Sequence, residues 1–204
     1  MDPEDNRREW AERSGRFSPA YYAHLGPNEV TDVLADALEY YASEDARILE
    51  LGCSSGRHLD HLRERGFENL TGIDINDDAF DVMADHYPAL AATGTFHVGP
   101  LEELLPEFDD GAFDAVYSVE TLQHVHPDDE WVFGEVARVT DDLLITAENE
   151  GNSPDRGPEA GVSCVDGEFP LYFRDWREIF LERGLTQLLE KPTKRDTVRV
   201  FRKG

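Results

Sequence analysis

This sequence contains few cysteines and no long apolar run. The only two cysteines, Cys53 and Cys164, do not have metal-ligand spacing, so neither a disulfide framework nor a zinc site is expected, and a reducing compartment fits. A run of about 18 apolar residues is missing, which argues against a transmembrane helix. Residues 1–5 lack the basic and apolar regions of a signal peptide, so we expect a cytoplasmic protein.

Basic residues are scarce as well, and lysine most of all. Asp and Glu total 44 against 19 Lys and Arg, which gives a net charge of −25, and three of the bases are lysines. Residues 66–137 contain no Lys or Arg, which argues against a protein that follows a phosphate backbone or an anionic membrane. The balance is similar to that of proteins from halophilic archaea, because dense carboxylates keep a protein hydrated in high salt.

Residues 171–204 reverse this balance, with nine Lys and Arg against five Asp and Glu. Two interpretations are open. Basic residues at the edge of a sheet discourage strand-to-strand aggregation. Alternatively, the segment forms a wall of the substrate site that faces an anion.

Short apolar runs alternate with longer amphipathic stretches, which is typical of helices packed around a mostly parallel sheet. Seven strands are expected, at residues 47–51, 70–75, 95–98, 113–118, 143–147, 185–189 and 197–201, the last two as an antiparallel pair at the sheet edge. Helices are expected at residues 28–41, 56–66, 77–87, 128–139 and 176–183, with Asp128 as a helix N-cap. Residues 149–168, rich in Gly, Pro, Asn and Ser, would form a long loop.

The most informative segment is residues 50–56, where an acidic residue at the end of a buried strand precedes a turn of small residues. Small residues let a ligand approach the backbone, and the next helix offers free N–H groups at its N-terminus. Asp74 lies 22 residues after Gly52, at the end of the second expected strand. A carboxylate there can accept hydrogen bonds from both ribose hydroxyls of a nucleotide.

A dinucleotide fold would have glycines at the first, third and sixth positions of this turn, but Gly52, Ser54 and Arg57 stand there. The segment instead resembles the first motif of the class I S-adenosylmethionine-dependent methyltransferases, with Ser54 in place of the central glycine. Residues 72–75, 113–118 and 121–125 are similar to the family's second-strand motif, its fourth-strand motif and the helix that follows.

The resemblance implies an α/β, Rossmann-like three-layer sandwich with a mixed seven-stranded sheet whose last strand is antiparallel. It implies S-adenosyl-L-methionine as the cofactor and a single domain over residues 1–204. Within that domain, residues 1–45 would form a helical lid with the first helix, residues 46–150 the cofactor-binding core, and residues 151–204 a substrate loop with the closing strands. The alternative is an unrelated Rossmann-like fold whose glycines merely pack helix on strand.

The cofactor-binding residues that the resemblance implies are Glu50, Gly52, Cys53, Ser54, Gly56, Asp74, Ile75, Leu101, Glu102 and Ser118. Those of the first motif would surround the methionine end, Asp74 would hold the ribose, and Ile75 would pack against adenine. Pro100 stands where the family often has an acid for the adenine amino group, so the backbone of Leu101 or the side chain of Glu102 would hold adenine instead. For Glu102, a solvated first turn of a helix is the alternative.

Methyl transfer is an in-line displacement in which the protein mainly orients the acceptor, and a base is needed only when the acceptor loses a proton. The catalytic candidates are His124 and Glu148, which follow the fourth and fifth expected strands. Ligands in open α/β sheets bind at those carboxyl ends. His124 is catalytic or structural, and Glu148 either orients the substrate or caps the next turn.

The predicted substrate-binding residues are Tyr22, Arg174 and Arg177. Tyr22 belongs to an N-terminal stretch of aromatics and arginine, with Trp10 and Arg13, that would be a lid over the cofactor or a helix covering the sheet. Arg174 or Arg177 would hold a carboxylate or phosphate of the acceptor, because a guanidinium is a bidentate anion clamp.

The sequence thus predicts a methyltransferase that acts, most readily at oxygen, on a small-molecule or glycan-like acceptor, with an anionic acceptor as one option. Two alternatives stay open: a methyltransferase-like module that binds the cofactor without turnover, and a nicotinamide-dependent oxidoreductase, which the turn pattern disfavours. A monomer or homodimer without nucleic-acid or membrane partners is expected.

Overall fold

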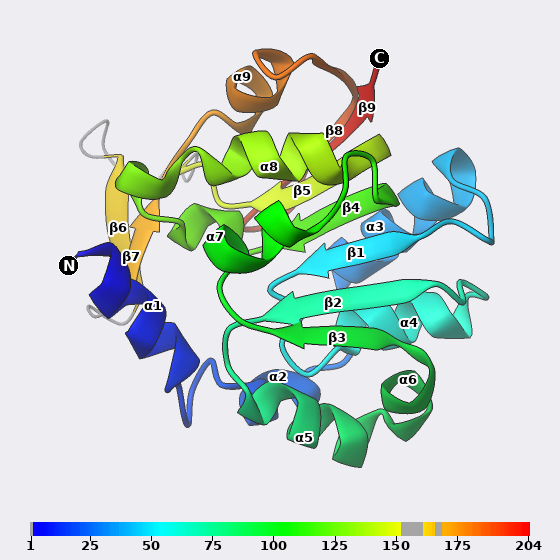
Figure 1. Cartoon of the computed structure of the whole chain (residues 1–204), viewed down its shortest axis with the longest axis vertical. Helices are drawn as coiled ribbons and strands as arrows, with labels where there is room; N and C mark the ends of the chain where they lie inside the picture. Colours follow the sequence, from blue (N-terminus) through cyan, green and yellow to red (C-terminus); the bar gives the residue numbers. More distant parts are fainter. Residues whose placement is uncertain (1, 152–160, 166–168) are drawn as a thin grey trace.

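A seven-stranded sheet with the order β3-β2-β1-β4-β5-β9-β8 forms the centre of the computed structural model, which describes residues 2–151, 161–165 and 169–204 (Figure 1). β1 to β5 pair in parallel, and β9 pairs antiparallel with both β5 and β8. The mixed Rossmann-like sheet predicted from the sequence is therefore confirmed. Its strands are β1 (Ile48–Leu51), β2 (Leu70–Asp74), β3 (Thr95–Val98), β4 (Phe113–Val119), β5 (Thr140–Glu148), β8 (Leu185–Pro192) and β9 (Thr197–Lys203).

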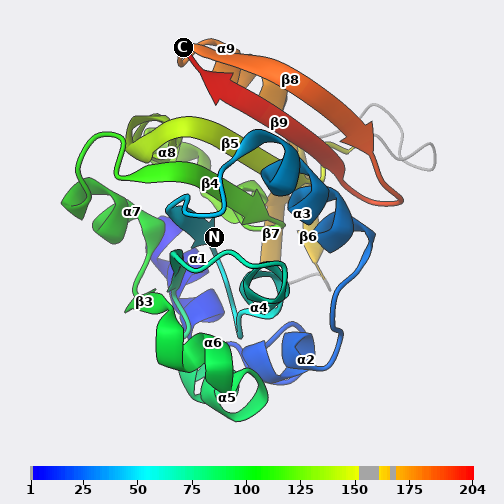
Figure 2. The same ribbon diagram turned by 90° about the vertical axis from the view of Figure 1, so that its right-hand side faces the viewer.

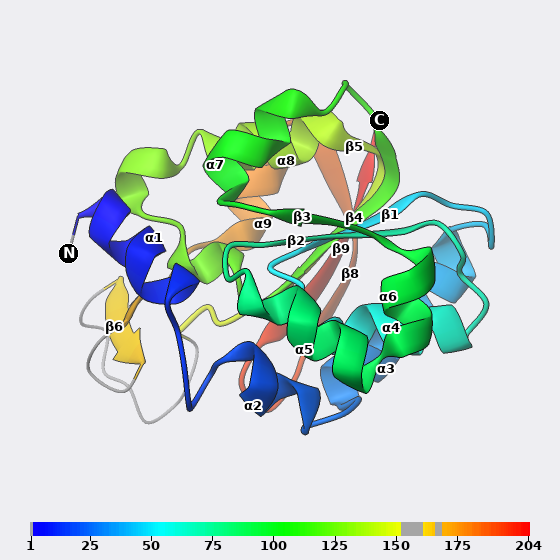
Figure 3. The ribbon, with the colours of Figure 1, turned by 60° about the horizontal axis from the view of Figure 1, so that its bottom comes forward.

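Helices cover both faces of this sheet, as Figure 3 shows. Ile48 and Ile145 contribute to the core on one face, whereas their neighbours Leu49 and Leu144 contribute to the core on the other, because successive strand side chains point to opposite faces. The first face packs against α3 (Glu29–Tyr41), α4 (Arg57–Glu64), α5 (Asp78–His86) and α6 (Pro88–Thr93). The second packs against α7 (Leu101–Leu104), α8 (Val132–Val139) and α9 (Trp176–Leu181).

Two N-terminal helices and a small sheet complete the architecture. In Figure 1, α1 (Pro3–Ala11) and the antiparallel pair of β6 (Val162–Val165) and β7 (Phe169–Tyr172) lie on the side to which the ends of β1 and β2 point. Figure 2 shows α2 (Pro19–Ala23) beside α5, at the opposite end of the view from the β8–β9 hairpin. These additional elements thus lie around the carboxyl ends of the parallel strands.

Two helix boundaries differ from the sequence prediction. The helix expected from Asp128 begins only at Val132, because residues Pro127–Asp129 form a separate 3-10 turn that the His126 side chain caps. Asp128 is therefore not its N-cap. Pro88 ends α5 but also begins α6, since a proline fits the first turn of a helix.

The segment expected as one long loop, residues 149–168, contains a strand. β6 pairs with β7, so the part of the chain that the structure describes forms nine strands rather than seven. Residues 152–160 and 166–168 of the predicted loop lie outside the described residues. Within the described ranges, no helix combines the length and the apolar character that a membrane span requires.

Candidate functional site

A pocket opens at the carboxyl ends of β1, β2 and β4, bordered by residues of α1 and α2. Its walls include the turn after β1, the start of α7 and the segment after β4. Nine sequence-predicted site residues line it: Tyr22, Gly52, Cys53, Ser54, Asp74, Ile75, Leu101, Glu102 and His124. The other six lie elsewhere: Glu50, Gly56, Ser118, Glu148, Arg174 and Arg177.

The turn after β1 has backbone angles that favour glycine. φ is +70° at Gly52 and +49° at Ser54. A Cβ on Gly52 would lie 2.1 Å from Thr121 Oγ1, so glycine lets this turn pack against the segment after β4. Ser54 adopts the left-handed conformation despite its Cβ, which is how it can stand at the position of a glycine.

Glu50 and Gly56 lie behind the pocket wall. Glu50 is 1% exposed and accepts a 2.9 Å hydrogen bond from the Tyr117 hydroxyl, and burial raises its pKa well above the usual range. A Cβ on Gly56, whose φ is +83°, would lie 2.6 Å from the Leu90 side chain. Neither residue is among those that line the pocket, and both support the turn from behind.

Asp74 is held at the pocket by the backbone on both sides of it. The N–H of Ser54 donates to one carboxylate oxygen at 2.7 Å, and the N–H of Asn76 donates to the other at 2.9 Å. Burial raises the pKa of Asp74, and these two hydrogen bonds oppose that rise. The carboxylate therefore couples the turn after β1 to the end of β2.

Ile75 and the start of α7 form another part of the pocket wall. Pro100 is the N-cap of α7 and lines the pocket beside Leu101 and Glu102. Arg7 on α1 lies 3.4 Å from Glu102 and 2.7 Å from Asp129, measured between guanidinium nitrogen and carboxylate oxygen. Glu102 is thus an anchor for α1 rather than a solvated first-turn acid.

His124 lines the pocket as a neutral imidazole. Its Nδ1 lies 2.9 Å from the Pro170 carbonyl oxygen, so we assign the ring proton to Nδ1. Burial lowers the pKa of His124 to about 4, which keeps the ring uncharged at neutral pH. The unprotonated nitrogen is therefore Nε2, which lies 3.4 Å from the side-chain amide nitrogen of Gln123.

Ser118 and Glu148 form a buried anchor for the segment after β4. Glu148 is fully buried and accepts from the Ser118 hydroxyl and from the backbone N–H groups of Thr121, Leu122 and Gln123. Of the two roles open for Glu148, the structure gives it the turn-capping one. Burial raises its pKa to about 7.

The titration of Glu148 predicts a pH effect on stability. Its folded-state pKa of about 7 exceeds the ordinary value of 4.5, so its contribution to stability is full below pH 4.5 and is lost as pH rises through 7. Between pH 5 and 8, wild-type protein should lose about 2 kcal/mol of unfolding free energy relative to the Glu148→Gln variant. Urea unfolding of both proteins measures this, and a pH-independent difference would contradict it.

Arg174 and Arg177, predicted as anion clamps, do not face the pocket. The Arg174 side chain is 7% exposed, pairs with Glu130 at 2.9 Å and donates to the Val125 carbonyl at 2.7 Å. Its guanidinium also lies 5.2 Å from the ring centre of Phe133. Arg177 is exposed on α9. The Phe133 ring and Glu130 hold the Arg174 guanidinium away from the pocket. The position of α9 in the fold leaves Arg177 outside the pocket as well.

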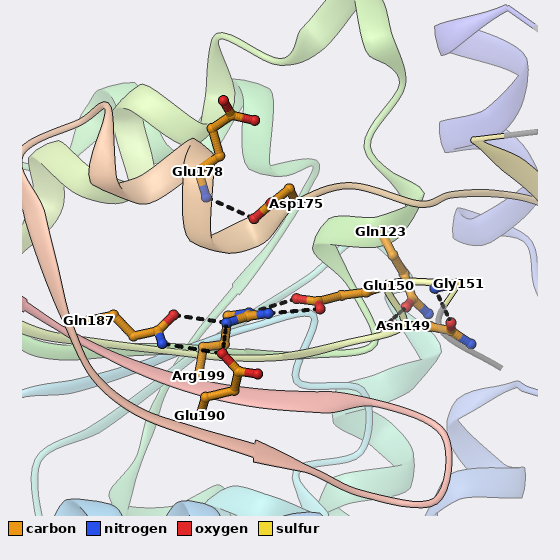
Figure 4. Close-up of polar contacts among 9 residues, drawn as sticks. All are labelled: Gln123, Asn149, Glu150, Gly151, Asp175, Glu178, Gln187, Glu190 and Arg199. Atoms are coloured by element: carbon orange, nitrogen blue, oxygen red, sulfur yellow. Dashed lines mark hydrogen bonds and ion pairs between the residues drawn. The ribbon is translucent and has the colours of Figure 1, made fainter. Parts of the chain in front are cut away.

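Arg199 joins the end of β5 to the β8–β9 hairpin (Figure 4). Its guanidinium donates to both carboxylate oxygens of Glu150, at 2.7 and 2.9 Å, and further to Glu190 at 2.6 Å and Gln187 at 2.8 Å. The side chains of Arg199 and Glu150 are 8% and 7% exposed. Arg199, a basic residue of the C-terminal segment, thus stabilises the edge of the sheet and does not form part of an anion site.

Several pocket residues were not predicted as ligand contacts. Arg57, at the sixth position of the turn, lies with its guanidinium 5.3 Å from the ring centre of Tyr22, and burial raises the pKa of Tyr22 to about 12. Asn6 and Trp10 of α1 also line the pocket. The N-terminal aromatic stretch indicates that Trp10 could lie over the site, whereas no sequence pattern singles out Asn6. Among the described residues, no group of three or more His, Cys, Asp or Glu is arranged to hold a metal ion.

Comparison with known proteins places these elements among methyltransferases. A family model described as a methyltransferase domain matches residues 48–142. A ubiquinone biosynthesis O-methyltransferase from Chromobacterium violaceum is 29% identical over 124 residues, 60% of this chain and 49% of that protein. The chain spans between a quarter and a half of the length of the curated relatives it matches.

Solved structures share the fold over nearly the whole chain. The PH0226 protein from Pyrococcus horikoshii OT3 has a TM-score of 0.68 at 19% identity, covering 100% of both chains. Magnesium protoporphyrin IX methyltransferase from Synechocystis PCC 6803, with bound SAM, has a TM-score of 0.65 at 16% identity, covering 98% of this chain and 91% of that one. At such identities, the likeness concerns the fold alone.

Proposed function

We propose that this chain, which belongs to the class I S-adenosylmethionine-dependent methyltransferase family, binds S-adenosylmethionine in the pocket and methylates a small-molecule acceptor. The observation that supports this best is the convergence of the turn after β1, Asp74 and the segment after β4 on one pocket. The methyltransferase-domain match spans these same elements. We retain residues 46–150 as the cofactor-binding core of one domain.

The pocket residues fit the cofactor. Each carboxylate oxygen of Asp74 accepts one backbone hydrogen bond, and a carboxylate oxygen has about two acceptor sites, so capacity remains for two ribose hydroxyls. Ile75 and Leu101 offer apolar contact for adenine. The turn at Gly52 and Ser54 would border the methionine end, where the cofactor supplies an activated methyl group and its own leaving group.

His124 is the proposed proton acceptor for a hydroxyl substrate. Its Nδ1–H is held by the Pro170 carbonyl, which leaves Nε2 free of a proton in a side chain that lines the pocket. Burial lowers the pKa of His124 to about 4, so the imidazole is a neutral acceptor and a weak base at neutral pH. We favour methylation at oxygen, as in the O-methyltransferases among the relatives.

The pocket lining favours an acceptor with an apolar or aromatic body. Phe17, Pro19 and Tyr22 line the pocket near the N-terminal helices. Arg57 brings one guanidinium to the same pocket, so an anionic group on the acceptor remains part of the proposal. This points to a small molecule rather than to a nucleic acid.

Two measurements test the proposal. Calorimetric titration with S-adenosylhomocysteine should show binding, and transfer of a labelled methyl group to a metabolite extract should show turnover. Binding without turnover over a broad extract would favour a cofactor-binding module. Absence of binding at every salt concentration would refute the proposed cofactor.

The proposed setting is a reducing, salt-rich cytoplasm. With 44 acids against 19 bases, self-repulsion should destabilise the fold at low salt. Unfolding in urea is therefore expected at a higher midpoint in molar KCl than in low salt. An equal midpoint in both would reject the high-salt adaptation.

A further inference from the structure

Two side chains of α1 that line the pocket carry buried polar atoms. Asn6 is 4% exposed, and its Nδ2 donates to the His124 carbonyl at 2.8 Å. Among the residues that the structure describes, its Oδ1 has no hydrogen-bond partner, and neither has Nε1 of Trp10. Both residues line the pocket. They are four apart on one helix, so they share one of its faces.

The Trp10 ring is held in place by its neighbours. Its centre lies 4.7 Å from that of His124 and 4.6 Å from that of Phe169. The Trp10 carbonyl lies 3.4 Å from the Asn76 Nδ2, just beyond Asp74. The indole N–H is therefore a buried donor on a fixed ring, and buried donors of folded proteins are nearly always paired. Because Trp10 lines the pocket, a ligand group bound there can be that partner.

The position of α1 indicates which part of a ligand it faces. Asn76, two residues after Asp74, donates to the α1 end, and Arg7 pairs with Glu102 at the start of α7. α1 therefore extends between the two places that border the nucleoside half of the pocket. The methionine half, at Gly52 and Arg57, is bordered instead by Tyr22 of α2.

We propose that Asn6 and Trp10 recognise the adenosine part of the bound cofactor. Asn6 Oδ1 accepts a hydrogen bond from an N–H or O–H group of the nucleoside, and Trp10 Nε1 donates one to a ring nitrogen or hydroxyl oxygen. Adenosine offers both kinds of group. This inference rests on the proposed function and adds a recognition element from outside the sheet.

The pair also links ligand binding to the position of α1. With the nucleoside bound, both buried atoms gain partners, so the docked position of α1 is stabilised. By reciprocity, interactions that dock α1, such as the ion pairs of Arg7, raise the affinity for the nucleoside. α1 is thus a part of the binding site and not only its cover.

The test compares two ligands and two tryptophan variants. Trp10→Phe keeps an aromatic ring but removes the N–H, and Trp131→Phe, at a half-exposed position outside the pocket, is the matched control. S-adenosylhomocysteine and 5′-methylthioadenosine share the adenosine, and the second lacks the amino-acid part. Calorimetry should show that Trp10→Phe lowers the affinity for both ligands by the same factor, roughly 3- to 10-fold. Trp131→Phe should bind both like the wild type.

Asn6→Ala is an independent variant, and it should also lower the affinity for both ligands, by about 3-fold or more. Wild-type affinity for 5′-methylthioadenosine in both folded variants would overturn the inference, even with the proposed function intact. Loss of S-adenosylhomocysteine affinity alone would assign the pair to the amino-acid part and overturn it as well. If the wild-type protein bound neither ligand, the proposed function itself would fail.

Discussion

Replacing Asp74 by alanine is expected to lower the affinity for S-adenosylhomocysteine by at least about 100-fold. A hydrogen bond to a charged group contributes about 1.5–3 kcal/mol, and two ribose hydroxyls would lose such a partner. The turn after β1 would also lose the acceptor of the Ser54 N–H, which lies 2.7 Å from the carboxylate. Both losses act on the same pocket, so the effect should be among the largest in the protein.

The matched control for this prediction is Asp77→Ala, which removes an exposed acid three residues further along. It should leave the affinity within about 2-fold of the wild type, because surface charges act weakly. Calorimetry gives the affinities, and urea unfolding confirms that each variant is folded. If Asp74→Ala bound S-adenosylhomocysteine as tightly as Asp77→Ala, Asp74 would not belong to the cofactor site.

Replacing Arg199 by alanine is expected to lower the free energy of unfolding by about 3–5 kcal/mol. The substitution would leave the Glu150 carboxylate, with a side chain 7% exposed, without the two hydrogen bonds that Figure 4 shows. Gln187 would lose a donor at the same time. A buried carboxylate that loses its bidentate guanidinium partner is costly, which makes this the largest expected stability effect.

Arg202→Ala is the control on the same strand. Arg202 pairs with Asp142 at 2.9 Å, but both side chains are more than 40% exposed, so its loss should cost less than about 1 kcal/mol. In the double variant Arg199→Ala with Glu150→Ala, much of the lost stability should return, because the buried carboxylate that lost the guanidinium is removed as well. Equal urea midpoints for Arg199→Ala and Arg202→Ala would contradict this account of the Arg199 network.

Much of the fold could be predicted because its signals are local. Asn28 begins α3 with a capping box, as its place before an apolar-periodic stretch indicates. Gly66 follows α4 with φ of +101°, a conformation that a glycine permits. The prediction failed at residues 127–131 and 162–165, where short turns and a short strand depend on partners from elsewhere in the chain.

Part of the candidate site was predictable for the same reason. The turn at Gly52 and the acid at Asp74 occur at a characteristic spacing, and the structure brings both to one pocket. The roles of Glu148 and Arg174 could not be derived in this way. A carboxylate or a guanidinium suits both a ligand and a neighbouring backbone group, and the sequence does not show which of them comes within reach.

The sequence by itself determined the positions along the chain of the seven strands of the large sheet, the glycine-containing turn and the acid at the end of β2. These features follow from periodicity and backbone conformation within a few residues. Only the tertiary structure decided which polar side chains face the pocket. Glu148 meets the N–H groups of residues 121–123, Arg199 meets Glu150, and α1 places Asn6 and Trp10 over the pocket. Such pairings join residues far apart in the chain, and their strength depends on burial, which packing alone creates.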